Sequence, residues 1–145
     1  MANTSITSAN SIFTVTVPGL FPTPVQLQGY SSDKAVITDA IEMAETQMGV
    51  DGRMTGGYVP AITKQTITLQ ADSPSRSIFK TIALATQASK EIFYIAGALD
   101  LPSTGESFIM PKGIIVNMKQ IPDLLKVLGP VDIMIHWEQV TSNPI

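Results

Sequence analysis

His136, the single histidine of this sequence, is its best candidate for acid–base or metal chemistry. Asp132 and Glu138 stand at even spacings from it, so an extended strand would place all three side chains on one face, where a carboxylate–imidazole pair could form. A metal site would need two or three further nitrogen or oxygen ligands from unrelated segments. We therefore favour a strand histidine that is exposed or lies at an interface.

Other catalytic and ligand-binding patterns are missing or incomplete. No serine stands in a Gly-x-Ser-x-Gly turn, and a catalytic triad would have to use His136. Residues 49–57 are rich in glycine, but no Lys-Ser or Lys-Thr follows as in a phosphate-binding loop, and the spaced carboxylates of a calcium loop are absent. We interpret this segment as the tip of a long hairpin whose glycines permit positive φ. The sequence predicts no enzyme, no cofactor and no metal.

Composition favours a protein that associates with copies of itself. The chain has 145 residues, which suggests one domain over residues 1–145. Its net charge of −3 excludes a general electrostatic nucleic-acid binder, which needs a basic face. Charged residues form only 14% of the sequence, against roughly 25% in an average soluble domain. Other subunits could cover part of such a surface; a monomer kept soluble by Ser, Thr, Gln and Asn is the alternative.

The compartment is indicated mainly by what the sequence lacks. There is no cysteine, so disulfide frameworks, thiolate metal sites and cysteine nucleophiles are excluded. The first residues do not have the basic and apolar regions of a secretory signal, and no apolar run approaches the eighteen or so residues of a membrane span. We expect a protein made in the cytoplasm, with no membrane partner.

The dominant hydrophobic period is two, which is typical of strands. The segments that fit strands are residues 13–17, 25–30, 63–71, 91–99, 114–116 and 131–137. Residues 91–99 form a continuous apolar run, which suggests a strand buried on both faces. Residues 36–48 fit a helix or a strand, and residues 122–128 fit a short helix or a loop.

One segment, about residues 74–90, is predicted to be a helix. Ser73 can cap its first turn, and Pro74 suits the first helical position because its missing N–H is not needed there. Ile78, Phe79 and Ile82 lie on an apolar stripe at a spacing of three to four. We expect these three residues to dock the helix on a sheet.

The order of these segments resembles that of the tail tube proteins of contractile-tailed bacteriophages, whose fold bacteriocin and type VI secretion tubes share. The matching features are an early strand pair with Gln-Gly-Tyr at 28–30 and Ser-Asp at 32–33, the Gly-Val-Asp-Gly tip at 49–52, the Thr-Ile-Thr-Leu-Gln strand at 66–70 leading through Ser-Pro-Ser at 73–75 into the helix, and a terminal Ile-Met-Ile strand at 133–135. The likeness spans roughly residues 10–140.

The resemblance implies a mainly β fold, an antiparallel barrel or sandwich with one flanking helix. It also implies that residues 37–48 form a long strand and that the tip reaches a neighbouring ring. The tip residues concerned are Gly49, Val50, Asp51, Gly52, Arg53 and Met54.

The implied function is structural. Tube proteins form hexameric rings that stack into the hollow tail tube of a virion, with the sheath, tape measure and baseplate or terminator proteins as further partners. DNA would pass through the lumen without specific binding, which suits an acidic chain because like charges repel. The alternatives are a small monomeric β-barrel that binds an apolar ligand and a tube subunit of a related secretion or bacteriocin particle.

Overall fold

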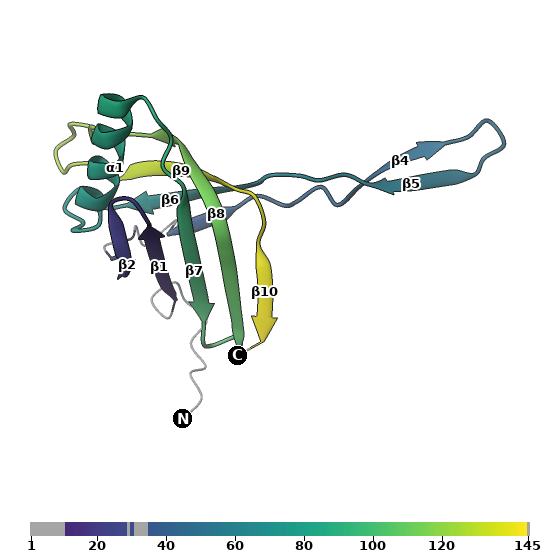
Figure 1. Cartoon of the computed structure of the whole chain (residues 1–145), viewed down its shortest axis with the longest axis horizontal. Coiled ribbons are helices and arrows are strands. Elements are labelled where there is room, and N and C mark those ends of the chain that lie inside the picture. Colours follow the sequence, from purple (N-terminus) through teal and green to yellow (C-terminus); the bar gives the residue numbers. More distant parts are fainter. Residues whose placement is uncertain (1–10, 29, 31–34, 145) are drawn as a thin grey trace.

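The fold is mainly β with one helix, as the sequence predicts. A computed structural model describes residues 11–28, 30 and 35–144, and Figure 1 shows their arrangement. The described elements are β1 (Ile12–Val17), β2 (Phe21–Gln26), β3 (Val36–Thr38), β4 (Ala44–Met48), β5 (Met54–Tyr58), β6 (Thr63–Leu69), α1 (Arg76–Ser89), β7 (Ile95–Leu101), β8 (Glu106–Met118), β9 (Val131–Trp137) and β10 (Thr141–Pro144).

Eight strands form one sheet in which every pairing is antiparallel. Their order is β2-β1-β7-β8-β9-β6-β3, and β10 pairs with β8 beside this path. An isolated bridge between Tyr30 and Leu69 brings the segment after β2 against β6, near the opposite edge of the sheet. The sheet therefore bends round toward closure, in keeping with the predicted barrel or sandwich.

The long strand β8 is the centre of this bend. Residues 106–109 pair with β10, and residues 113–118 pair with β9 along the same edge. The register shifts between Ile115 and Asn117 on the β9 side, and between Ile95 and Gly97 on the β7 side. Such irregularities bend a strand and increase its twist, so one strand can serve both halves of the sheet.

The core lies between the bent sheet and α1. Along β9, buried residues alternate strictly with more exposed ones from Val131 to Trp137, as the period of two predicts. Trp137 is fully buried, and Gly97 and Gly113 leave room for its ring, because a Cβ on either glycine would meet ring carbons at 3 Å or less. Ile78, Phe79 and Ile82 of α1 belong to the same core cluster.

The helix begins later than predicted. Its N-cap residue is Ser75, without a side-chain capping hydrogen bond, and Ser73 is not the cap. The Ser73 hydroxyl accepts from the N–H of Ser75 at 3.2 Å and donates to the carbonyl of Gln28 at 2.5 Å, and the Ser75 hydroxyl accepts from the N–H of Gln28 at 2.7 Å. Both serines thus tie the β6–α1 connection to the segment after β2.

Several strand boundaries also differ from the prediction. The strand predicted over 91–99 begins only at Ile95 and runs to Leu101, and most of its residues are partly exposed rather than buried on both faces. Residues 36–48 form two short strands instead of a helix or one long strand, and residues 122–128 form a loop, one of the two alternatives predicted for them. The second predicted strand begins at Phe21 and ends at Gln26; as an edge strand it tolerates its prolines.

Candidate assembly interface

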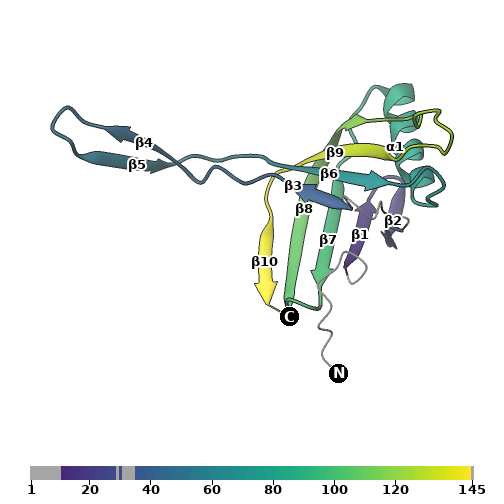
Figure 2. The same cartoon turned by 180° about the vertical axis from the view of Figure 1, so that it is seen from behind.

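A long hairpin, residues 39–62, projects far from the rest of the molecule; we call it the arm. Figures 1 and 2 show it leaving the sheet between β3 and β6 and carrying β4 and β5 at its far end. Strands β4 and β5 pair only with each other, as a separate two-stranded sheet. All side chains of residues 39–58 are exposed. The far half of the arm therefore has no contact with the core of its own chain.

The paired part of the arm has one apolar face and one polar face. Directly opposed residues share a face, and residues two apart along a strand do so too. One face thus presents Ala44, Thr46, Met48, Met54, Gly56 and Tyr58. The other face presents Glu45, Gln47, Thr55 and Gly57. Met48, Met54 and Tyr58 are 67–83% exposed, so the apolar face lies open to water.

The tip of the arm is a tight, hydrogen-bonded loop. The N–H of Gly49 donates to the carbonyl of Arg53 at 2.8 Å, and the N–H of Gly52 donates to the carbonyl of Gly49 at 3.0 Å. Asp51 Oδ1 accepts from the N–H of Arg53 at 3.2 Å. Gly52 has φ +84°, which a three-residue hairpin loop requires at its last position. Of the six predicted tip residues, five form this loop with Asp51 at its centre, and Met54 begins β5.

The root of the arm is fixed by buried polar groups that sequence reasoning missed. Trp137 Nε1 donates to Gln65 Oε1 at 2.9 Å, and Gln65 Nε2 donates to Thr38 Oγ1 at 3.0 Å. The N–H of Asp39 then donates to the carbonyl of Lys64 at 2.9 Å, which prolongs the β3–β6 ladder into the arm. The period of two in β6 places Gln65 on the buried face with Ile67 and Leu69, and the alternation in β9 places Trp137 on the buried face, but neither pattern shows that the two side chains bond to each other.

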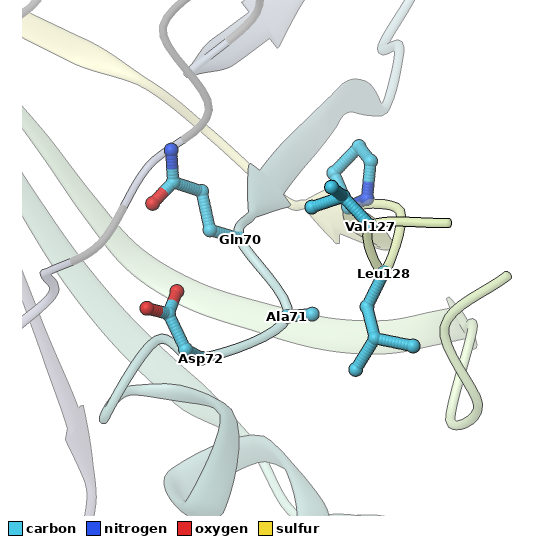
Figure 3. A pocket seen from close by; sticks show the side chains of 6 residues that line it. Gln70, Ala71, Asp72, Val127 and Leu128 are labelled. Atoms are coloured by element: carbon cyan, nitrogen blue, oxygen red, sulfur yellow. The ribbon is translucent and has the colours of Figure 1, made fainter. Parts of the chain in front are cut away.

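A second exposed apolar surface lies at the other end of the molecule. The β8–β9 connection, residues 119–130, is the end loop, and Figure 1 shows it beside α1, away from the arm. Its exposed apolar residues are Ile121, Leu124, Leu125, Val127 and Leu128. Together with the turn after β6 it encloses a depression of about 530 Å³, the end hollow, lined by Gln70, Ala71, Asp72, Val127, Leu128 and Pro130. Figure 3 shows Gln70 and Asp72 on one side of it and Val127 and Leu128 on the other.

The residues considered for chemistry are not brought together. Asp132 Oδ1 accepts from the hydroxyl of Thr68 at 2.9 Å, and Glu138 forms a 3.8 Å ion pair with Lys112. No ion pair within the described residues joins His136 to either carboxylate. Across the same described part of the chain, no three His, Cys, Asp or Glu residues are grouped so that they could hold a metal ion.

No described helix has the length and apolar character needed to cross a bilayer.

The predicted tip residues and the predicted helix-docking residues lie in different parts of the molecule. The tip residues are fully outside the core, whereas Ile78, Phe79 and Ile82 are buried in it. The molecule thus has a projecting hairpin with an apolar face, a hollow at the opposite end, and the sheet with α1 between them. This arrangement is typical of a subunit that contacts other proteins.

A family model described as tail fiber protein gp32 matches residues 4–141, nearly the whole chain. The chain belongs to this family. No curated protein sequence matches it.

Solved structures from contractile injection systems share the fold at low sequence identity. The tube-terminating cap structure of the anti-feeding prophage contains a chain that matches with a TM-score of 0.66 and 12% identity, over 100% of this chain and 95% of that one. The sheath/tube terminator structure of an extracellular contractile injection system, PVC, contains one with a TM-score of 0.64 and 11% identity, over 99% of both chains. A chain of the anti-feeding prophage baseplate structure has a TM-score of 0.62 and 8% identity.

Proposed function

We propose that this protein is a non-enzymatic structural subunit that forms hexameric rings, and that these rings stack into the hollow inner tube of a contractile phage tail. The observation that carries the proposal is the arm, whose apolar face has no partner among the described residues of its own chain. An isolated two-stranded hairpin is only marginally stable in water, so the arm gains a firm conformation when another subunit covers it.

The amount and character of the surface support an assembled state. The accessible surface of the chain is 9588 Å², about a third more than the roughly 7,200 Å² expected for a folded monomer of its mass. Exposed apolar residues gather on the arm and on the end loop rather than being scattered singly. Large unpartnered apolar surface is typical of protein–protein contacts.

Within the proposed tube, the tip residues 49–54 reach the next ring. Family membership and the shared fold support a place in a tail, with the sheath, the tape measure and the baseplate or terminator proteins as further partners. The subunit is made in the host cytoplasm and ends in the virion. Its net charge of −3 favours a lumen through which DNA slides without being held.

A second candidate role is that of a ring that ends the tube. Two of the matching chains come from structures of a sheath/tube terminator and of a tube-terminating cap, and the alignments span almost the full length of both chains. A tube subunit adds rings without limit, whereas a terminator stops at one. The end state of assembly therefore distinguishes the two roles.

The test is negative-stain electron microscopy and sedimentation velocity of the purified full chain over a range of concentrations. Tubes of uniform bore support the tube role, and single hexameric rings support the terminator role. A monodisperse monomer at the highest concentration would overturn both.

A matched pair of arm variants locates the contact in the same experiment. Met48→Ser removes apolar surface from the apolar face, and Gln47→Ser changes the neighbouring residue on the polar face. Both positions are exposed, so neither variant should alter the melting temperature by more than a few degrees. We expect Met48→Ser to reduce assembly and Gln47→Ser to leave it unchanged. Equal assembly of the two variants would mean that the apolar face is not the contact.

A further inference from the structure

The end hollow is a built surface rather than a chance gap between loops. Arg76 of α1 joins its two walls, because its guanidinium donates to the carbonyl of Ala71 in the turn after β6 and, at 3.3 Å, to the carbonyl of Gln120 in the end loop. The end loop is also closed on itself at Asp123, whose carbonyl accepts from the N–H groups of Leu125 at 3.0 Å and Gly129 at 3.1 Å. The apolar residues of the end loop are therefore held outward in a fixed arrangement.

The arm tip is complementary to this hollow in apolar character and in charge. The tip presents the fully exposed Val50 and the exposed Met54, and the hollow presents Val127 and Leu128. Arg53 at the tip and Asp72 in the hollow are both exposed, and neither has an ion-pair partner among the described residues. One surface projects and the other is concave, and the exposed side chains of Arg53 and Asp72 carry opposite charges.

The positions of the two surfaces exclude a contact within one chain. Figures 1 and 2 show the arm leaving one end of the sheet and the end loop lying beside α1 at the other end. An arm extended in this way cannot fold back onto its own hollow. A second copy of the chain can supply a hollow for this arm tip.

We propose that the arm tip of one copy docks in the end hollow of a second copy. Val50 and Met54 pack against Val127 and Leu128, and Arg53 pairs with Asp72. This inference rests on the proposed function, because it names the partner of the arm within the assembly. The contact joins unlike surfaces at opposite ends, so it repeats head to tail and builds a ring or a stack instead of a closed dimer.

The first test is a charge exchange. Arg53→Asp and Asp72→Arg each place like charges together, so each should raise the concentration needed for assembly by about tenfold or more. The double variant restores an opposite pair and should recover assembly toward the wild-type level. Glu45→Arg on the polar face of the arm and Glu91→Arg after α1 are the matched charge reversals, and they should have little effect.

The second test uses the absence of cysteine from the chain. A Val50→Cys, Val127→Cys double variant should form a ladder of covalent multimers when it is assembled and mildly oxidised. Val50→Cys alone, or combined with Glu91→Cys, should give no ladder. This readout does not depend on the strength of one ion pair.

The outcomes separate this inference from the proposed function. If the wild type assembles but the charge reversals have no effect and the cysteine pair gives no ladder, the docking is wrong and the ring-forming role stands. If single reversals block assembly and the double variant does not recover it, the Arg53–Asp72 pairing is wrong. A wild type that stays monomeric overturns the proposed function, and the docking with it.

Discussion

Trp137 and Gln65 are joined by a buried hydrogen bond of 2.9 Å between the indole Nε1 and the amide Oε1, which links the end of β9 to the start of β6. Because the amide oxygen faces the indole, the amide nitrogen faces Thr38, to which it donates at 3.0 Å. Thr38 is the last residue of β3, where the arm begins. The direction of the arm is therefore set by a side chain anchored in the core.

Removing this anchor should destabilise the fold. Gln65→Leu keeps the volume of the side chain but leaves the buried N–H of Trp137 without an acceptor, so we expect a loss of about 1–3 kcal/mol in the free energy of unfolding. Denaturant titration measures this loss. Thr38→Val removes the acceptor of the Gln65 amide nitrogen, but Thr38 is exposed and water can replace its hydroxyl, so this variant should cost less than about 1 kcal/mol. Equal effects of the two variants would show that water reaches the indole.

Because of the Trp137 ring, alanine substitutions at Gly113 and Gly97 should lower stability by different amounts. A Cβ on Gly113 would lie 2.3 Å from a ring carbon, and one on Gly97 would lie 2.9 Å from another. Overpacking of a filled core costs roughly 1–3 kcal/mol, so we expect Gly113→Ala to lose more stability than Gly97→Ala. Gly57→Ala is the control, because nothing lies within 4 Å of its added methyl. Thermal melts that rank Gly97→Ala below Gly113→Ala would contradict the close approach of the ring to β8.

The parts of the fold that follow from local pattern were predictable. Strand β9 alternates strictly because one face is buried, and α1 carries its buried residues at a helical spacing. The split of residues 36–48 and the late start of β7 were not predictable. Met43, Met48, Ile92 and Tyr94 are apolar but exposed in the single chain, so hydrophobicity there does not report burial in its own core.

One part of the candidate interface, the arm tip, could be predicted from the sequence, and the end loop only in part. Glycines in a short polar segment marked the tip, since Gly52 needs a positive φ. The end loop was one of two alternatives for residues 122–128, because these residues fit a short helix equally well. Its shape depends on local backbone hydrogen bonds to Asp123 and on the contact of Arg76 with Gln120, which exists only once α1 is packed beside the loop.

Phe79 should anchor α1 to the sheet. Its side chain is fully buried in the core cluster, so Phe79→Ala should cost on the order of 3–5 kcal/mol in denaturant titration. Leu84→Ala, on the exposed side of the same helix, should change stability by less than about 0.5 kcal/mol. A cost below about 1 kcal/mol for Phe79→Ala would mean that the core closes without the helix.

Tyr30 should make stability fall at alkaline pH. Burial raises the pKa of its hydroxyl above the ordinary value near 10, and the hydroxyl has no hydrogen-bond partner among the described residues. Above about pH 10 the unfolded chain therefore loses a proton that the folded chain keeps, so the contribution of Tyr30 is present below that pH and is lost as the pH rises. Tyr30→Phe should reduce this loss of stability at alkaline pH without lowering stability at pH 7. Tyr58→Phe on the arm should leave the alkaline loss unchanged. Identical alkaline melts of the wild type and Tyr30→Phe would exclude Tyr30 as the cause.

The tip should matter for assembly more than for folding. Gly52 has φ +84°, a conformation that a β-branched residue adopts only with strain, although nothing lies within 4 Å of its Cβ position. Gly52→Val should therefore cost roughly 1–3 kcal/mol, all of it local to the arm, and leave the melt of the body nearly unchanged. Each subunit of a tube repeats the same contact, so a small defect at every tip multiplies into a failure to polymerise.

Gly57→Val, which also has open space around its Cβ but no positive φ, separates strain from added bulk. Melts paired with sedimentation check both variants: polymerisation of Gly52→Val at the wild-type concentration would remove the tip from the interface, and loss of the whole fold would place the tip in the core.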